Sequence, residues 1–264
     1  MPCGAISRWP GLVRSCSLID LYLWPALWAV VIVAVVLRSF TGFGFALAAV
    51  PGFALFLPPA QAVVLSASLS LALGVQTFPQ YRGKTPLRPM IPLFLAAIVG
   101  TVLGAQLLVL LSVSTFMLLI GVAVIAACLA LSVFHPRRRK AGNALRLGAG
   151  LSSGLMNGAF AIPGPPIIIY AMATESDPAA SRALMILFFT FSSLVALLTF
   201  SAGGLVSLNS LWLFLLGYPA MFLGDRLGFS LFKRYGGRFY RRVALVALFL
   251  VGVSILLKGL SSLS

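Results

Sequence analysis

Long apolar bands follow one another along the whole chain, and short polar or basic loops separate them. The bands cover residues 21–57, 60–79, 90–111, 113–134, 145–173, 183–203, 206–232 and 243–257. A helix needs about 20 apolar residues to cross a bilayer, so this pattern predicts an all-α, polytopic membrane protein with about eight transmembrane segments. The bands fill the chain and leave no room for a separate soluble domain.

The second half of the chain repeats features of the first half in the same order. Three pairs of segments correspond: TGFG at 41–44 with FAIPG at 160–164, the proline-led stretches from Pro58 and Asp177, and the glycine pairs Gly100/Gly104 and Gly224/Gly228. Such an internal repeat predicts two related membrane units. The expected organisation is an N-terminal tail at 1–20, a first membrane repeat at 21–134, a basic connecting loop at 135–146, a second membrane repeat at 147–257 and a C-terminal tail at 258–264.

The basic loops indicate that the two repeats are inverted. In the first half, the loop after the second band is basic, at 82–88, and the next loop is neutral. In the second half the neutral loop comes first and the basic loop, at 233–242, follows. Basic loops favour the cytoplasmic side, so equivalent loops would face opposite sides of the membrane. This arrangement requires that bands 21–57 and 145–173, as re-entrant segments or two-pass hairpins, make no net crossing.

Composition excludes several classes of protein. Of the 264 residues, 61% are hydrophobic and 9% are charged, whereas soluble domains have roughly 25% charged residues. The net charge of +15 lies in short loops beside the bands, which suits membrane orientation. No basic face combines with stacking aromatics, so no nucleic-acid partner is expected. Three scattered cysteines and one histidine cannot form a disulfide framework or a metal cluster, so no metal or other cofactor is expected.

Two apolar segments interrupted by glycine or proline mark the predicted binding site. Proline breaks a helix, and non-helical backbone at membrane depth is tolerated only inside protein or beside a cavity. The N-terminus of a half-helix offers unpaired amides to an anion; the alternative is a kinked helix that packs against a neighbour. The predicted substrate-binding residues at the breaks are Thr41, Gly42, Gly44, Asn157, Gly158, Pro163, Gly164 and Pro165. Thr41 and Asn157 would donate hydrogen bonds or cap the breaks.

Three charged residues complete the predicted site. Arg38, directly before the first break, is costly in lipid and is expected to face a cavity or a partner. Its planar fork suits an oxyanion, and snorkelling to the interface is the alternative. Arg182 begins the band after the second break and is assigned to the same vestibule. Asp225 is a candidate proton-coupling carboxylate, with an interfacial position as the alternative. The two glycine pairs are assigned to helix packing, and Asp177 to an N-cap.

The interrupted segments also resemble those of a known family. TGFGFALAAVPGFALFLPPAQAV, GAFAIPGPPIIIYAM and DPAASRALMILFF look like the two halves of the sulfite exporter (TauE/SafE-type) membrane transporter family, from about Trp24 to Leu257. The resemblance implies a multi-pass permease of the bacterial inner membrane with about eight spans. It further implies movement of small sulfur-containing or organic anions, such as sulfite or sulfoacetate.

The second break departs from the glycine-rich G-x-x-G-x-G-G-P pattern of that family. Gly158, Gly164 and Pro165 match the pattern, but Ala161 and Pro163 replace two of its glycines. These substitutions lie where a substrate would touch, so the substrate of this protein is left open.

The residues themselves favour an anion transporter that works by alternating access around the broken helices, and the resemblance implies that it is an exporter. A cation or amino-acid exporter would need a buried carboxylate, for which only Asp225 is available. A membrane-embedded enzyme would need paired acids, a metal cluster or a nucleophile with a base, so no catalytic residue is assigned. The expected partners are a small anionic substrate and the lipid bilayer. A homo-oligomer and a non-transporting assembly subunit are left open.

Overall fold

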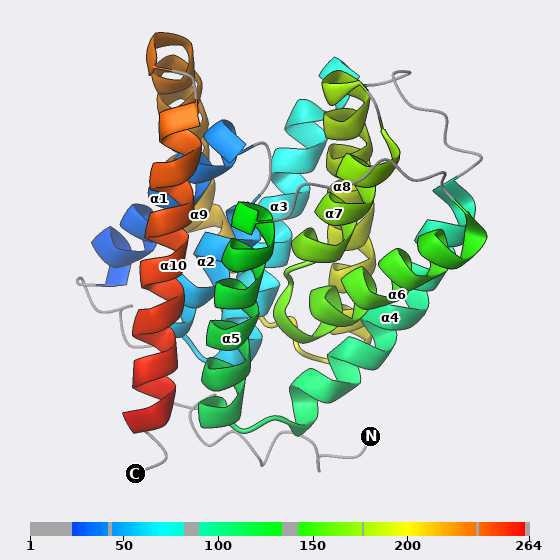
Figure 1. Cartoon of the computed structure of the whole chain (residues 1–264). Helices are drawn as coiled ribbons and strands as arrows, with labels where there is room; N and C mark the ends of the chain where they lie inside the picture. The colour runs from blue at the N-terminus through cyan, green and yellow to red at the C-terminus, as the bar shows by residue number, and fades with distance from the viewer. Residues whose placement is uncertain are drawn as a thin grey trace.

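The fold is helical throughout the residues that the computed structural model describes, which are 23–41, 44–81, 90–133, 142–175, 177–235 and 238–261. Ten helices lie in these ranges: α1 (Leu23–Thr41), α2 (Phe45–Ala54), α3 (Pro59–Tyr81), α4 (Ile91–Leu110), α5 (Val113–Val133), α6 (Asn143–Phe160), α7 (Gly164–Thr174), α8 (Pro178–Ala202), α9 (Leu208–Tyr235) and α10 (Arg238–Ser261). They pack as a bundle of long, tilted helices around the shorter α2 and α7 (Figure 1).

Four stretches of helix are long and apolar enough to cross a membrane. They are Pro59–Pro79, Ile91–Leu110, Val113–Ala130 and Ala179–Ala202. Shorter apolar stretches accompany them in α1, α2, α7 and α10. Length and composition therefore agree with the all-α, polytopic membrane protein that the apolar bands predict.

Both interrupted bands are divided at the predicted breaks, so eight bands become ten helices. α1 ends at Thr41 and α2 begins at Phe45; α6 ends at Phe160 and α7 begins at Gly164. The prediction that neither band is one unbroken helix is confirmed. Each break contains a residue with left-handed backbone, Gly44 in the first and Ala161 in the second, and this residue redirects the chain.

The two breaks reach left-handed backbone with different residues. Gly44, the N-cap of α2, has φ 102°, a conformation that glycine adopts without steric cost. Ala161, the C-cap of α6, has φ 51°, which is rare for a residue with a Cβ. Its N–H donates to the Asn157 carbonyl at 2.7 Å, and the next N–H, of Ile162, donates to the Met156 carbonyl at 3.3 Å. The bond from the left-handed Ala161 to Asn157 is the single bond of the αL C-cap motif.

The proline-led segments after each break begin helices of the same kind. α3 starts at Pro59 and α8 at Pro178, a first helical position where the missing N–H has no intrahelical partner to lose. The Asp177 carboxylate accepts the N–H groups of Ala179 and Ala180 at 3.1 and 3.2 Å. The predicted N-cap at Asp177 is therefore confirmed.

Two predicted basic loops are shorter than the sequence pattern indicates. α9 continues to Tyr235 and α10 begins at Arg238, so most of the predicted loop at 233–242 is helical. Likewise α6 begins at Asn143, inside the predicted connecting loop at 135–146. Lysine and arginine are good helix formers, and an apolar band marks only the part of a helix that is hydrophobic.

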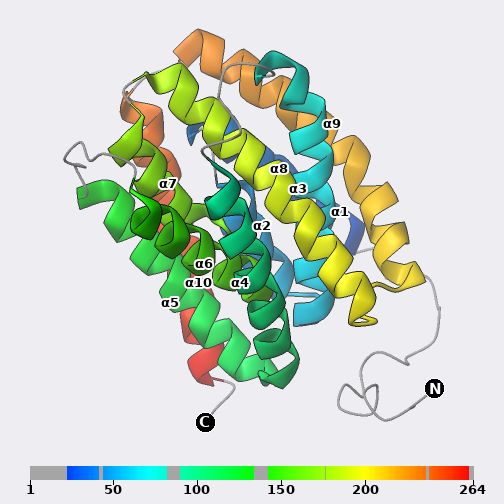
Figure 2. The ribbon, with the colours of Figure 1, turned by 90° about the vertical axis from the view of Figure 1, so that its right-hand side faces the viewer.

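The helices group into two bundles and a pair. The first bundle consists of α1, α2, α3 and α9, in which α9 packs on α1 and α3. The second bundle consists of α4, α6, α7 and α8, in which α4 packs on α6 and α8. Leu93, Ile168 and Phe188 belong to an apolar cluster that is confined to this second bundle. The bundles meet where α3 crosses α8, and α5 packs on α10 beside them (Figure 2).

These contacts are preserved when the first five helices are exchanged in order with the last five. The exchange turns the α4–α6 contact into the α9–α1 contact, and it maps the α3–α8 and α5–α10 contacts onto themselves. In Figure 1, α3 runs upward beside the descending α8, and α5 runs upward beside the descending α10. Corresponding helices in these two pairs are therefore antiparallel.

Small residues permit the closest helix contacts. In α4, a methyl group added at Gly100 or Gly104 would meet the backbone of α6, and one added at Gly150, Gly154 or Gly158 in α6 would meet the backbone of α4. In α9, Gly224 and Gly228 face Ile32, Val35, Val36 and Ser39 of α1. The packing role predicted for both glycine pairs is confirmed.

Candidate functional site

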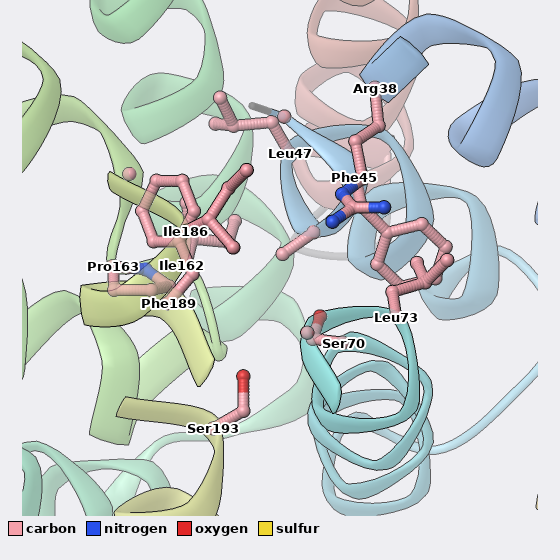
Figure 3. Close-up of a pocket in the computed structure, with 14 residues that line it drawn as sticks. Arg38, Phe45, Leu47, Ser70, Leu73, Ile162, Pro163, Ile186, Phe189 and Ser193 are labelled. Atoms are coloured by element: carbon pink, nitrogen blue, oxygen red, sulfur yellow. The ribbon is translucent and has the colours of Figure 1, made fainter. Parts of the chain in front are cut away.

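A small pocket lies where the two breaks meet. Its cavity volume is about 50 Å³, and its walls come from both bundles. The first bundle contributes Arg38 at the end of α1, residues 44–47 at the start of α2, and Ser70, Leu73 and Gly74 of α3; the second contributes residues 162–164 and Ile186, Phe189 and Ser193 of α8. Figure 3 shows these side chains converging from both sides of the α3–α8 crossing. The breaks, more than a hundred residues apart in the chain, thus form one site.

The walls of this pocket are mostly apolar and carry one charge. Leucine, isoleucine and phenylalanine side chains make up most of the lining, with the hydroxyls of Ser70 and Ser193 as neutral polar groups. Among the described lining residues Arg38 is the only charged one, and no acidic side chain joins it. A cation in such surroundings attracts an anion more strongly than it would in water, because the effective dielectric constant is low.

Thr77 of α3 holds the Arg38 guanidinium. Nη2 of Arg38 donates to Thr77 Oγ1 at 3.3 Å, and the Thr77 hydroxyl donates in turn to the Leu73 carbonyl at 2.8 Å. A hydroxyl has one proton and two lone pairs, so using the proton within α3 leaves the oxygen free to accept from arginine. Arg38 is half-buried, and Figure 3 shows its guanidinium directed into the pocket. The arginine therefore faces a cavity and a partner, and of the two alternatives for this residue the structure agrees with the cavity and not with snorkelling.

Two helix N-termini open on the pocket, but they differ in the donors that they offer. In α2 the first intrahelical bond at the break runs from Ala48 N–H to the Gly44 carbonyl at 3.2 Å, so the amides of residues 45–47 have no partner within the helix. In α7 the second and third residues are Pro165 and Pro166, which have no N–H. The first break therefore carries most of the backbone donors, and the second supplies mainly a rigid wall.

Four of the predicted substrate-binding residues line this pocket. They are Arg38, Gly44, Pro163 and Gly164. Thr41 is the last residue of α1, but its side chain and the whole of Gly42 lie outside the described residues. Pro165 is buried in the first turn of α7, directly behind the wall that Pro163 and Gly164 form.

Asn157 and Gly158 lie on the packing surface of α6 and are not part of the pocket lining. Asn157 is 1% exposed, and its Nδ2 donates to Thr101 Oγ1 at 3.2 Å and to the Ser192 carbonyl at 2.8 Å. These bonds join α6 to α4 and α8. Gly158 faces the Thr101 carbonyl of α4. Contact of either residue with a substrate stays a prediction.

Arg182 and Asp225 also lie outside the pocket lining. Arg182 is half-buried in the first turn of α8, and Asp225 is half-buried in α9 between the two glycines that face α1. The neighbouring Arg226 is exposed and lies over the Phe222 ring, with its guanidinium carbon 4.5 Å from the ring centroid. Such a cation–π contact suits an arginine that points away from the bundle.

Sequence reasoning missed the contribution of α3 and α8 to this site. Ser70 and Ser193 line the pocket, and Thr77 positions the arginine. The available signal was the recurrence of hydroxyl residues in otherwise apolar helices, as in SASLS at 66–70 and FTFSS at 189–193. Buried hydroxyls need hydrogen-bond partners, so their presence in a membrane helix indicates a polar cavity or a neighbouring polar group.

The fold and the pocket together define a class of protein. Paired helix breaks from two related halves, meeting inside a membrane bundle around a partly polar cavity, are typical of a membrane transporter. The model of the family described as sulfite exporter TauE/SafE matches residues 27–255, so this chain belongs to the sulfite exporter TauE/SafE family. The resemblance seen in the sequence is thereby confirmed. No curated protein and no solved structure matches the chain. Because the family is one of membrane transporters, the protein is a transporter and not an enzyme.

Proposed function

We propose that this protein exports small sulfur-containing or organic oxyanions, such as sulfite or sulfoacetate, across the bacterial inner membrane. The observation that carries this proposal is the Arg38 guanidinium, which points into a small, mostly apolar pocket. A planar guanidinium binds an oxyanion through two parallel hydrogen bonds. The absence of an acidic group among the described lining residues disfavours the alternative of a cation or amino-acid exporter.

The dimensions of the pocket suit a small anion. Cavity volume is taken here as the space that the centre of a water molecule can occupy. About 10–15 Å³ of such space holds one water molecule, and the pocket has about 50 Å³. It therefore has room for a few water molecules or one small oxyanion. The amides of residues 45–47, which have no partner within α2, and the positive end of the α2 dipole would stabilise the negative charge beside Arg38. Ser70 and Ser193 would donate to the remaining oxygens from the opposite walls.

The same proposal includes alternating access by an inverted repeat. Support comes from the helix contacts that survive exchange of the two halves and from the antiparallel course of α3 and α8. α1 with α2, and α6 with α7, would form hairpins that return to the side where they began, which meets the parity condition set by the basic loops. Neither hairpin then makes a net crossing.

The moving bodies in this scheme are the two bundles and not the two sequence repeats. Each bundle combines three helices of one repeat with the fourth helix of the other, through the tight α1–α9 and α4–α6 contacts. The pocket lies between the bundles. A rocking motion at the α3–α8 crossing would therefore open the pocket first to one side of the membrane and then to the other.

The test is anion flux through the purified protein in proteoliposomes. Sulfite, sulfate, sulfoacetate and simple carboxylates are compared, each with and without a pH gradient, with protein-free liposomes as the control. We expect flux of at least one small oxyanion and competition between the oxyanions that are carried. Flux of a basic amino acid, with none of the anions carried, would overturn the proposal.

A further inference from the structure

Two helix pairs of this protein carry polar residues at corresponding positions. In α4, Thr101 directly follows Gly100 and precedes Gly104, the glycines that face α6. In α9, Asp225 directly follows Gly224 and precedes Gly228, the glycines that face α1. Thr101 and Asp225 therefore occupy the same place relative to the α4–α6 and α9–α1 contacts.

The partner helices also carry polar residues at corresponding positions. Arg38 precedes Thr41, the last residue of α1, by three positions. Asn157 precedes Phe160, the last residue of α6, by three positions. Both helices end at a break, so Arg38 and Asn157 occupy the same position relative to the end of their helix.

One of these two pairs forms a hydrogen bond in the structure. Nδ2 of Asn157 donates to Oγ1 of Thr101 at 3.2 Å, with both side chains buried. The correspondence places a donor at Arg38 where the other half has the donor Asn157. It places an acceptor, Asp225, where the other half has the acceptor Thr101. The neutral pair of one half thus has a charged counterpart in the other.

The α1–α9 contact brings the charged counterparts near one another. A methyl group at Gly224 would lie 3.2 Å from the Ile32 Cα, and one at Gly228 would lie 3.2 Å from the Val36 Cα and against Ser39. Asp225 lies between these two contact points along α9, and Arg38 is the neighbour of Ser39. The long stem of an arginine side chain lets its charged head swing to a new partner while its backbone stays in place.

We propose that Asp225 is a second partner of Arg38 and that the two form an ion pair when the pocket holds no anion. In the present structure Arg38 donates to Thr77 and points into the pocket. An anion in the pocket attracts the arginine charge, and when the anion leaves, a carboxylate group on the neighbouring helix attracts the same guanidinium. Asp225 supplies that group, so it is a positioning residue that releases Arg38 to the substrate. This role in the cycle rests on the proposed anion transport; the pair itself does not.

The pair is tested first without any substrate. The melting temperatures of the wild type, Arg38→Gln, Asp225→Asn and the double variant are measured in an anion-poor detergent buffer, as a double-mutant cycle. We expect the double variant to melt no lower than the worse single variant, because each single change already removes the pair. Additive losses would overturn the pair. If Asp225→Asn alone does not fold, the double variant is compared with Arg38→Gln, in which the carboxylate has already lost its partner; a double variant that melts clearly below Arg38→Gln also overturns the pair. A cycle with Asn157→Ala and Thr101→Ala is the neutral reference.

The role of the pair is tested by comparing two modes of transport. During exchange of labelled sulfite or sulfoacetate, the carrier returns across the membrane with an anion bound. During net efflux into anion-free buffer, it returns with its pocket empty. We expect Asp225→Asn to reduce net efflux at least about thirtyfold more than exchange, the lower end of the effect of removing one partner of an enclosed charge pair. The exposed Arg226→Gln is the matched control and should alter neither mode. Equal losses in both modes would overturn the role in the cycle. A wild type that carries no oxyanion overturns the proposed function, and the melting cycle then still decides whether the pair exists.

Discussion

The two breaks share one architecture but have different chemistry. The first break, between α1 and α2, uses glycine to reach a left-handed backbone, leaves the first amides of α2 without a partner in that helix and places an arginine beside the pocket. The second break, between α6 and α7, reaches a similar backbone with Ala161 and follows it with prolines that remove amides. At the position that corresponds to Arg38 it has Asn157, which joins neighbouring helices. Two similar breaks thus form two walls of one pocket, and they differ in charge and in the backbone donors that they offer.

The sharpest test of this division is Arg38→Ala. We expect anion flux to fall at least about a hundredfold, because loss of a buried, charge-assisted contact to a ligand costs several kcal/mol. Initial rates in proteoliposomes measure the change, and the protein should still purify as a single folded species. Arg226→Ala, which removes the same charge from an exposed position on α9, is the control. Unchanged flux in Arg38→Ala would contradict the proposal that the first break binds the anion through its charge.

Gly158→Ala tests whether the second break acts through packing. The added methyl group would meet the Thr101 carbonyl and the Ala105 N–H of α4, and neither backbone group can move away without separating the helices. We expect stability to fall by about 3 kcal/mol, the upper range for overpacking, seen as a lower melting temperature in detergent. Gly148→Ala, in the same helix but with open space around the added methyl, should not destabilise the protein. Equal effects of the two changes would contradict the packing role.

Gly44→Ala compares the backbone of the first break with that of the second. Alanine at a φ of 102° should cost about 1–2 kcal/mol, the penalty for left-handed backbone in a residue with a Cβ. The reverse change, Ala161→Gly, removes such strain at the second break but adds about 0.5–1 kcal/mol of chain entropy. We therefore expect a clear destabilisation from the first change and a shift close to zero from the second, measured by thermal melting. If both changes destabilise equally, the two breaks do not differ in strain.

Pro165→Ala tests the smallest difference, the missing amides of α7. Alanine at this second helical position restores one N–H at a helix N-terminus that opens on the pocket. An anion near such an N-terminus gains about 0.3–1 kcal/mol, so the half-saturating concentration for anion flux should fall by up to about fivefold. Saturation curves of initial flux provide the measurement. Pro92→Ala, near the start of α4 and away from the pocket, is the control, and a weaker affinity in Pro165→Ala would contradict this account of the two N-termini.

Local chemistry made the fold of this protein predictable up to the point where helices meet. Glycine and proline positioned both breaks, Pro178 and Asp177 positioned the start of α8, and apolar length indicated most helices. The end of α9 and the start of α10 were harder to predict, because each helix includes basic residues that lie outside the apolar band. The glycine pairs indicated close packing but could not specify which helix each pair would contact.

The candidate site was accessible only in part for the same reason. Arg38, Gly44, Pro163 and Gly164 could be predicted because they lie at breaks, where the sequence is irregular. Ser70 and Ser193 reach the pocket through the crossing of α3 and α8, which no local pattern specifies. Asn157 illustrates a second reason. A polar residue beside a break can bind a ligand or join helices, and the sequence does not distinguish these two roles.

The exchange of long helices between the bundles bears on how such a protein could have arisen. α4 buries its glycines against α6, and α9 buries its glycines against α1, so each half of the chain completes its packing with a helix of the other half. A half-length chain could not cover these surfaces as a monomer. Two copies would have covered them by swapping their fourth helices, a low-cost route to a dimer, and fusion of the two genes would then have fixed that antiparallel dimer in a single chain.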